Sequence, residues 1–326
     1  MNERIRRRHL LAALALAVVP GTHARAQADW PARPVRLVVP GPPGGGTDVM
    51  GRLLAEQLHA VFKQPFIVDN KPGANGLLAS DLVARAPADG YVLLFSYTAA
   101  MVINPGLFSR APDPVQSFEP VAQIGSMGNV LLVTPDLPVG NLSELIAYAK
   151  RQSTPVSYGS WGVGSGGQLT MESFLRRAQI SMNHVPYKGV ANVVTDMLGG
   201  VVKVGWGDVS STVGHVKSGK LKALAVSGTQ RVPQFPDVAT MGEQGFAFDT
   251  TSWYGVFAPA RTPAAIVSRL NAEITRAVSS KQFRERLYAL NQPNSPTPDP
   301  AAFRQRVIDD QKIWLGILQD LGIKPE

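Results

Sequence analysis

The stretch that organises the chain runs from Val35 to Leu54 and reads VRLVVPGPPGGGTDVMGRLL. Its first five residues are mostly apolar and β-branched, residues 40–46 are almost entirely proline and glycine, and Thr47 opens an amphipathic pattern. The stretch therefore predicts a strand, a tight loop and a helix. Unpaired backbone N–H groups lie at the positive end of such a helix, where a carboxylate or phosphate can bind without a cationic side chain. We expect this loop to bind a ligand.

The N-terminal residues form a separate module. Four arginines precede an apolar run over 10–19, and the small-residue triplet Ala-Arg-Ala follows at 24–26. This layout is typical of a secretory signal, so residues 1–26 are predicted to be a signal peptide that is cleaved after Ala26. Adjacent arginines also loosely match a twin-arginine signal, which leaves the export route open between that system and the general one. The apolar run is shorter than the about 20 residues that a membrane span needs.

Composition narrows the possible functions. The 326 residues are 44% hydrophobic and 17% charged, as expected for a globular chain with one large core or two smaller ones. The formal net charge is +8, of which the predicted signal peptide carries +4. The remaining lysines and arginines are scattered, so nucleic acid is not an expected partner. The chain has no cysteine, which excludes a disulfide scaffold, a thiol nucleophile and a thiolate metal site.

The order of predicted elements occurs twice: strand, helix, strand, helix, strand. The strands of the first unit are expected at 35–39, 66–68 and 91–95, and those of the second at 156–158, 183–187 and 201–206. In each unit a glycine-rich loop follows the first strand. The loops that follow the second strands are related to each other, KPGAN from Lys71 and KGVAN from Lys188. Right-handed crossovers bring the strand ends of each unit to one edge of its sheet. We therefore predict two similar α/β units rather than a proven duplication.

The chain is expected to cross between these units twice. Extended apolar runs at 121–133 and 251–259 could carry the crossings, and two amphipathic helices follow at 263–278 and 300–321. If these helices pack on the first unit, a double crossing gives the geometry of a hinged clamp. The predicted domains are domain 1, residues 27–125 with 254–326, and domain 2, residues 126–253.

Motifs for cofactor binding are weak. Gly162, Gly164 and Gly167 match G-x-G-x-x-G, but the next strand ends at Tyr187 and Lys188, where a dinucleotide fold would place an acidic residue. The first loop lacks the Lys-Ser/Thr ending of a phosphate-binding P-loop, and no G-x-S-x-G nucleophile motif occurs. The histidines of the mature chain are too far apart in sequence for a zinc pair on one element. We expect no catalytic residue, no metal and no cofactor.

Several polar residues of the loops also have a structural role available. Thr47 and Asp48 are good helix caps, and Ser165 with Gln168 matches the capping box Ser-x-x-Gln. A cap does not exclude binding, because the glycines leave other N–H groups free. Asp208 follows a predicted strand and is either a solvated turn residue or an acceptor for a ligand N–H or hydroxyl group, and both alternatives stay open.

Five segments in the order of the chain carry a family resemblance. They are WPxRPVRLVVPxPPGGGTD after the signal, YGSxGxGSGG, VPYKG, SGKLKALAV and WYGVFAPARTPAAIVSRLNAEI. The chain resembles the solute-binding receptors of tripartite tricarboxylate transporters, also called Bug receptors, over nearly all of its mature length. The resemblance implies a type II periplasmic-binding-protein fold, with two α/β domains, two interdomain crossings and a ligand cleft between the domains.

The resemblance also implies that small carboxylates bind through the two glycine loops, partly through water. By position, the resemblance implies that the ligand-binding residues are Pro43, Gly44, Gly45, Gly46, Thr47, Asp48, Ser96 and Thr98 in the first domain. In the second domain they are Ser160, Gly162, Gly164 and Ser165. Our interpretation of the loops and strand ends adds Trp161 and Asp208. Gln168 opens the second helix where many relatives carry a histidine, so the identity of the solute stays open.

We therefore expect a monomeric periplasmic receptor that closes on a small organic acid, a carboxylate or a related amide. It would deliver this ligand to the membrane permease subunits of a tripartite transporter, without catalysis. One alternative is an extracytoplasmic sensor that docks on a sensor kinase. Another is an exported hydrolase or isomerase with Asp48 or Asp208 as its base, for which the sequence offers no recognisable nucleophile, metal set or acid–base pair.

Overall fold

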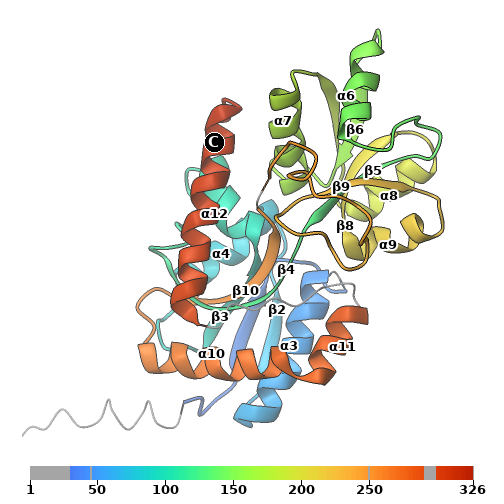
Figure 1. The fold of residues 1–326 in the computed structure, drawn as a ribbon. Helices are drawn as coiled ribbons and strands as arrows, with labels where there is room; N and C mark the ends of the chain where they lie inside the picture. Colours follow the sequence, from blue (N-terminus) through green and yellow to red (C-terminus); the bar gives the residue numbers. More distant parts are fainter. Residues whose placement is uncertain (1–29, 45, 249, 290–298, 326) are drawn as a thin grey trace, which may run out of the picture.

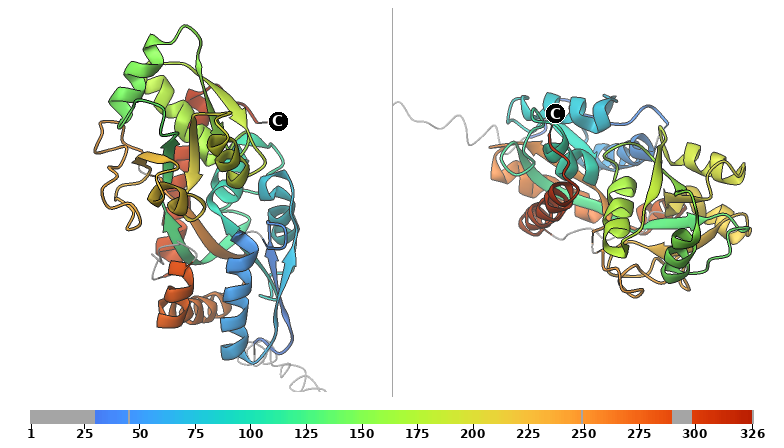
Figure 2. Two further views of the ribbon diagram at one scale, coloured as in Figure 1. Left: turned by 90° about the vertical axis from the view of Figure 1, so that its right-hand side faces the viewer. Right: turned by 90° about the horizontal axis from the view of Figure 1, so that it is seen from above.

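The computed structural model describes residues 30–44, 46–248, 250–289 and 299–325. The predicted signal peptide, its cleavage after Ala26 and the predicted site residue Gly45 lie outside the described residues. None of the helices in the described part of the chain is long and apolar enough to cross a membrane. Two α/β units form two lobes, one above the other in Figure 1 and side by side in the right-hand view of Figure 2.

The first unit is built on a mixed five-stranded sheet with the order β2-β1-β3-β10-β4. Its strands are β1 (Val35–Val39), β2 (Phe66–Asn70), β3 (Val92–Tyr97), β4 (Phe118–Met127) and β10 (Ser252–Pro259). Strands β1, β2 and β3 are parallel, whereas β10 runs antiparallel to both of its neighbours. Four of the five residues of β1 are buried, as expected for a parallel strand covered on both faces.

Helices cover both faces of this sheet. Its helices are α3 (Gly46–Phe62), α4 (Leu77–Ala84), α5 (Asn104–Leu107), α10 (Ala264–Ser279), α11 (Lys281–Ala289) and α12 (Pro300–Asp320), with short turns η1 (Ala74–Gly76) and η2 (Ala99–Ile103). Apolar side chains of α3, α10 and α11 share one core with β1, and those of α4, η2 and α12 pack on the other face. The predicted C-terminal helices are present, and α11 is an additional one between them.

The second unit repeats this plan with the order β7-β6-β8-β5-β9. Its strands are β5 (Asn129–Val133), β6 (Val156–Ser160), β7 (Met182–Pro186), β8 (Val204–Asp208) and β9 (Lys222–Val226), and its helices are α6 (Leu142–Arg151), α7 (Gly166–Ala178), α8 (Val190–Leu198) and α9 (Val209–Lys217). Again three strands are parallel, and the strand that arrives from the other unit, β5, is antiparallel. The prediction of two similar α/β units is confirmed, and each unit is built on a mixed five-stranded sheet.

The two crossings lie side by side. Gly128 alone separates β4 from β5, and a Cβ atom there would lie 2.3 Å from the carbonyl oxygen of Ser227, so only glycine fits. Asn129 donates its N–H to Ser227 Oγ (2.8 Å), and Ser252 at the start of β10 bonds Asn129 Oδ1 (3.3 Å). The predicted domain boundaries fall within the ends of β4 and β10, where the chain passes from one sheet to the other.

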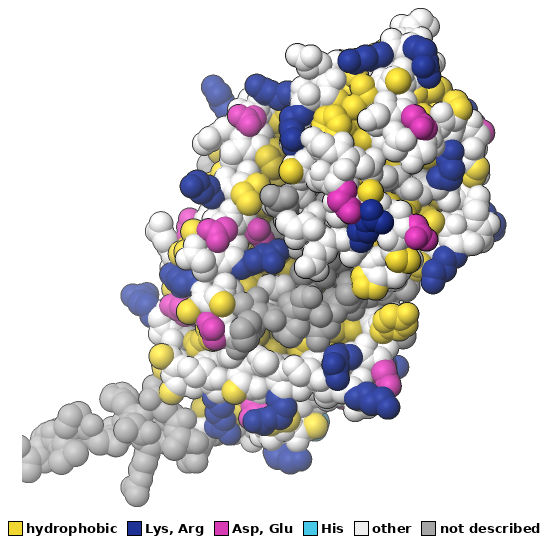
Figure 3. All heavy atoms as spheres, viewed as in Figure 1, with side chains coloured by type: hydrophobic (Ala, Val, Ile, Leu, Met, Phe, Trp, Pro, Cys, Tyr) yellow, Lys and Arg dark blue, Asp and Glu magenta, His cyan; other side chains and the backbone are white. Residues whose placement is uncertain are grey.

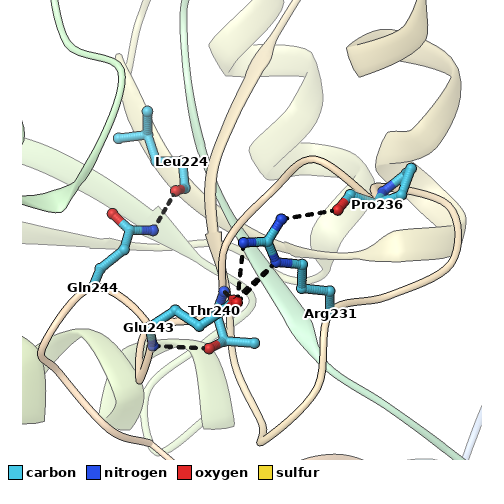
Figure 4. Close-up of polar contacts among 6 residues, drawn as sticks. All are labelled: Leu224, Arg231, Pro236, Thr240, Glu243 and Gln244. Carbon is cyan, nitrogen blue, oxygen red and sulfur yellow. Dashed lines mark hydrogen bonds and ion pairs between the residues drawn. The ribbon is translucent and has the colours of Figure 1, made fainter.

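The segment from β9 to β10 is held on the second unit by polar contacts (Figure 4). Arg231 Nε lies 3.0 Å from both carboxylate oxygens of Glu243, and its Nη1 donates to the carbonyl of Pro236. The guanidinium holds the pKa of Glu243 at about 2. Gln244 donates to the carbonyl of Leu224 in β9 at 2.8 Å. These contacts therefore hold residues 231–244, which precede the second crossing, on the second unit.

Candidate functional site

The first glycine loop is held by a carboxylate in the helix that follows it. Asp48 is 3% exposed, and its Oδ2 accepts hydrogen bonds from the backbone N–H of Gly44 (2.8 Å) and from Nε of Arg52 (3.0 Å). Its Oδ1 accepts from Nδ2 of Asn70 (2.9 Å). These donors, Arg52 first, hold the pKa of Asp48 below its ordinary value of 3.8. Asp48 is therefore charged at neutral pH and orients the loop from beneath.

The second glycine loop has the same construction with a different side chain. Ser165 is the N-cap of α7 and accepts from the N–H of Gln168, as the capping-box pattern predicts. The Oε1 of Gln168 in turn accepts from the N–H of Gly164 at 2.7 Å. Gly44 and Gly164 both have a positive φ, +78° and +70°. In each loop a glycine in left-handed conformation is thus tied to a side chain four residues later.

Two serines support the second loop from inside. Ser160 Oγ is fully buried and contacts His184 Nε2 (2.7 Å), Ser165 Oγ (3.2 Å) and the carbonyl of Gly162 (3.1 Å). Ser165 Oγ also donates to the carbonyl of Gly162 at 2.6 Å. Burial lowers the pKa of His184, so the imidazole is neutral at pH 7. Ser160 and His184 thus shape the loop from behind it.

A cavity of about 440 Å³ opens between the two units. Its volume lies in the range of about 300–1,000 Å³ that is usual for small-molecule sites. Residues of both units line it: Asn75, Tyr97, Trp161, Gly162, Val163, Ser165, Lys188, Gly189 and Val190. The cavity therefore brings together the predicted residues Trp161, Gly162 and Ser165 with the wall of the first unit.

Asn75 and Tyr97 belong to the cavity wall, although our sequence reasoning did not select them. Four consecutive residues from Gly73 to Gly76 have positive φ, including the non-glycine residues Ala74 and Asn75. Tyr97 donates its hydroxyl to Asn75 Oδ1 (3.2 Å), and Asn104 bonds both the side chain and the carbonyl of Asn75. Backbone strain of this kind persists where the surroundings hold it, often at binding sites. The repeated KPGAN and KGVAN loops were the available signal.

None of the predicted residues of the first unit that the structure describes is among the residues that line this cavity. Thr98 is buried and holds β3 to β10, since its Oγ1 accepts from the N–H of Trp253 (2.7 Å) and donates to the carbonyl of the same residue. Ser96 is fully buried, and its hydroxyl has no hydrogen-bond partner among the described residues. Pro43 is exposed in the loop, and Gly46 is the first residue of α3, so Thr47 lies in the first turn.

Asp208 and Tyr254 approach each other from the two sheets. Asp208 is the N-cap of α9 and accepts from the N–H (2.8 Å) and hydroxyl (2.9 Å) of Ser211. Tyr254 lies opposite Tyr97 in the β10–β3 pairing, so both rings stand on the same face of the first sheet. Burial, followed by the charge of Asp208, raises the pKa of Tyr254, whose side chain also bonds Thr47.

The chemistry available at this site is binding. No group of three or more His, Asp or Glu side chains within residues 30–44, 46–248, 250–289 and 299–325 could hold a metal ion. On the face drawn in Figure 3, lysine and arginine side chains are dispersed among acidic ones rather than gathered in a stripe. The cavity instead offers the N-terminal ends of α7 and α8, at Ser165 and Gly189, together with hydroxyl and amide side chains, one indole ring and the side chain of Lys188.

Comparison with known proteins agrees with this arrangement. The model of the tripartite tricarboxylate transporter family receptor matches residues 50–323. Protein BugT of Bordetella pertussis is 36% identical over 321 residues, which cover 97% of this chain and 98% of that protein. A solved structure of an R. palustris protein with adipate has a TM-score of 0.80 and 31% identity, covering 91% of this chain and all of the other. MatC from Rhodopseudomonas palustris with bound malate has a TM-score of 0.76 and 29% identity, covering 89% and 100%.

Proposed function

The chain belongs to the tripartite tricarboxylate transporter receptor family, and we propose that it captures a small organic acid in the cleft between its two domains and delivers it to the membrane subunits of such a transporter. The family consists of solute-binding receptors and not of enzymes. Periplasmic binding proteins are among its structural relatives, and a periplasmic location with a cleaved signal peptide over 1–26 is part of the proposal.

One observation supports the proposal: the two glycine loops, one in each unit, repeat one construction. Gly44 is tied to Asp48, and Gly164 is tied to Gln168. Each tie fixes a loop at the N-terminus of a helix, so the remaining N–H groups have a set direction before the ligand arrives. Each helix end favours an anion by about 0.3–1 kcal/mol, and by up to about 2 kcal/mol where water is excluded. Two such ends favour a carboxylate.

Ligand size is bounded by the cavity and by the relatives. A volume of about 440 Å³ is sufficient for a short organic acid. Two relatives were solved with dicarboxylates of this size, adipate and malate. We propose that the N–H groups of Gly46, Thr47 and Val163, which follow the glycines in the two loops, contact the ligand together with the side chains of Asn75, Tyr97 and Trp161. In this proposal Asp48, Ser160 and Gln168 act by holding the loops.

Capture would proceed by closure of domain 1, residues 27–125 with 254–326, on domain 2, residues 126–253. The two crossings at Gly128 and Ser252 provide a narrow hinge, because few backbone bonds need to rotate there. Closure excludes water and strengthens the interaction of the N–H groups with an anion. A monomer that needs no cofactor suffices for this cycle, and the closed form would then dock on the permease.

The direct test is to identify the ligand. Protein purified from the periplasm is denatured, and the released small molecules are identified by mass spectrometry. Protein stripped by unfolding and refolding is then heated with a panel of carboxylates and their amides. A ligand of the folded state at 100 times its Kd stabilises by about 2.7 kcal/mol, a readily measured thermal shift. The proposal predicts a shift with at least one small carboxylate, and no shift with any of them would contradict it.

A further inference from the structure

The indole ring of Trp161 lies flat on the first turn of α7. A Cβ atom at Gly167 would be 2.6 Å from Cζ3 of this ring, and 2.8 and 3.0 Å from the neighbouring carbons Cη2 and Cε3. An approach in the plane of the ring would leave both neighbours much farther away than the nearest carbon, so these near-equal distances place Gly167 against the face of the ring. Gly166 lies beside it, since its Cβ atom would be 3.8 Å from Cζ2 of the same ring. One face of Trp161 is thus seated on the helix.

The ring has room because α7 begins with two glycines. Gly166 and Gly167 are the first two residues of this helix, and both are buried. Consecutive glycines weaken a helix, because glycine loses more conformational freedom on folding than other residues do. Neither glycine has a positive φ, so the backbone itself would accept other residues there. The close approach of Trp161 therefore requires glycine at position 167, and the conformation of the helix does not.

The seated ring is also part of the cavity wall. Trp161 is half-buried, and it lines the cavity together with the apolar side chains of Val163 and Val190. Tyr97 lines the same cavity from the first unit, and its hydroxyl is held by Asn75 at 3.2 Å. One aromatic side chain from each unit therefore borders the space in which we place the ligand. Aromatic surfaces bind flat unsaturated groups through ring stacking in addition to the apolar area that is buried.

One cationic side chain lines the same cavity. The N–H of Tyr187 donates to the carbonyl of Ser160 at 2.9 Å, so the residues that follow, Trp161 and Lys188, leave two neighbouring strands together. Lys188 is exposed and lines the cavity, and its ammonium group has no ion pair or hydrogen bond with any residue that the structure describes. A carboxylate that binds near Lys188 would have the rest of the ligand beside the indole ring.

We propose that Trp161, seated by Gly167, is a specificity-determining residue that selects carboxylates with a flat unsaturated body, such as an aromatic ring, over saturated carboxylates of the same size. A flat ring keeps all of its carbons in contact with the indole face, whereas a saturated ring is puckered and touches that face with fewer atoms. The inference rests on the proposed function, because it assumes that this cavity holds the carboxylate. It distinguishes this chain from the relatives that were solved with the open-chain acids adipate and malate.

Matched ligand pairs test the inference. Isothermal titration of stripped protein compares benzoate with cyclohexanecarboxylate, phenylacetate with cyclohexylacetate, and terephthalate with its saturated trans ring analogue. In at least one pair the flat ligand is expected to bind at least about fivefold more tightly than its saturated partner. If every saturated partner binds as well as its flat counterpart, or if only open-chain acids bind, the inference fails and the proposed function stands. If no carboxylate in these pairs or in the wider thermal-shift screen binds, both fail.

Substitutions of the ring and of its seat assign the preference to Trp161. Trp161→Leu keeps an apolar side chain without a flat face, and Gly167→Ala places a methyl group where the ring lies while favouring the helix. In each variant the ratio of the dissociation constants of the saturated and the flat ligand is expected to fall to about twofold or less. Trp161→Phe, which restores a flat ring, should keep a higher ratio than Trp161→Leu.

Gly214→Ala is the matched control for Gly167→Ala. Gly214 is an exposed glycine of α9, and a Cβ atom there meets no atom within 4 Å. This variant should keep the ratio of the wild type. An unchanged ratio in folded Trp161→Leu or Gly167→Ala protein, or an equal change in the control, would overturn the assignment.

Discussion

The backbone N–H of Gly164 donates a 2.7 Å hydrogen bond to Oε1 of Gln168, and the N–H of Gly44 donates a 2.8 Å hydrogen bond to Oδ2 of Asp48. Both bonds join a glycine of positive φ to a side chain four residues later. The two units thus hold their glycine loops in the same way but with different acceptors, a carboxylate in the first loop and a neutral amide in the second. In the second loop the anion site gains no additional negative charge.

Gln168→Ala removes the acceptor of the Gly164 N–H. Loss of one such hydrogen bond is expected to cost about 0.5–1.5 kcal/mol of stability and to weaken carboxylate binding by about tenfold, because the loop loses its fixed direction. Titration calorimetry and urea unfolding measure the two effects. Gln152→Ala, an exposed glutamine at the end of α6, is the matched control and should bind as the wild type does.

Gln168→Glu separates the geometry of this tie from its charge. Glutamate keeps an acceptor for Gly164, so stability is expected to stay within about 0.5 kcal/mol of the wild type. The added charge opposes an anionic ligand at the start of α7, so binding should weaken and should do so more at low ionic strength. The affinities of Gln168→Glu and the wild type are compared between 20 and 200 mM salt, roughly a threefold change in Debye length. Equal affinities of the two proteins over this range would argue against a carboxylate at this helix end.

Asp48 gives the stability a dependence on acidic pH. Its folded pKa lies below 3.8, so its stabilising contribution is fully present above about pH 4 and is lost as the pH falls through the folded value. Asp48→Asn lacks this contribution and is expected to be about 1–3 kcal/mol less stable at pH 7. Urea midpoints of both proteins should converge below the folded pKa. A difference that stays constant down to pH 2 would contradict this assignment.

His184 makes the stability depend on pH in a second range, at weakly acidic pH. Burial lowers its pKa below 6.5, so the unfolded chain binds more protons than the folded one at a pH between the two values. Stability is therefore lost as the pH falls from 6.5 toward the folded pKa. His184→Asn should remove this part of the profile when urea midpoints are measured between pH 5 and 8 (a range near the ordinary pKa of about 6.5). His59→Asn, at the exposed end of α3, should keep the wild-type profile.

Tyr97→Phe tests the strained loop beside the cavity. The tyrosine hydroxyl donates to Asn75 Oδ1 at 3.2 Å and helps to hold Asn75 at positive φ. Its removal is expected to cost about 0.5–1.5 kcal/mol and to weaken ligand binding by several-fold, about the effect of one hydrogen bond. Tyr288→Phe is the control, because Tyr288 is 70% exposed on α11. Equal affinities of the two variants would remove Asn75 and Tyr97 from the proposed site.

The fold could be predicted because its signals are local. The glycine loops follow apolar strands and open amphipathic helices in both units, and the order of elements repeats. Helix α11 was not predicted, since Phe283 and Leu287 alone are buried among its residues 281–288 and the other side chains there are mostly polar. A stripe of two residues is too short to be distinguished from a loop by periodicity.

The site could be predicted only in part, because side-chain direction depends on tertiary contacts. The loop of residues 159–167, which borders the cavity, could be predicted from its glycines. The inward direction of Ser160 depends on His184, which lies 24 residues away, and that of Thr98 depends on Trp253, 155 residues away. Neither partner is adjacent in sequence. Asn75 was missed for the same reason, since its conformation is held by Tyr97 and Asn104.

The most direct test of the account measures whether both glycine loops bind the same ligand. Gly44→Ala meets no atom within 4 Å, and Gly164→Ala meets Leu107 Cδ1 at 2.4 Å, but both force a methyl group onto a backbone of positive φ. The dissociation constant of the carboxylate released from the purified protein is measured by calorimetry for the wild type and for each variant. The account predicts folded variants that each bind at least about tenfold more weakly. Wild-type affinity in either variant would contradict it.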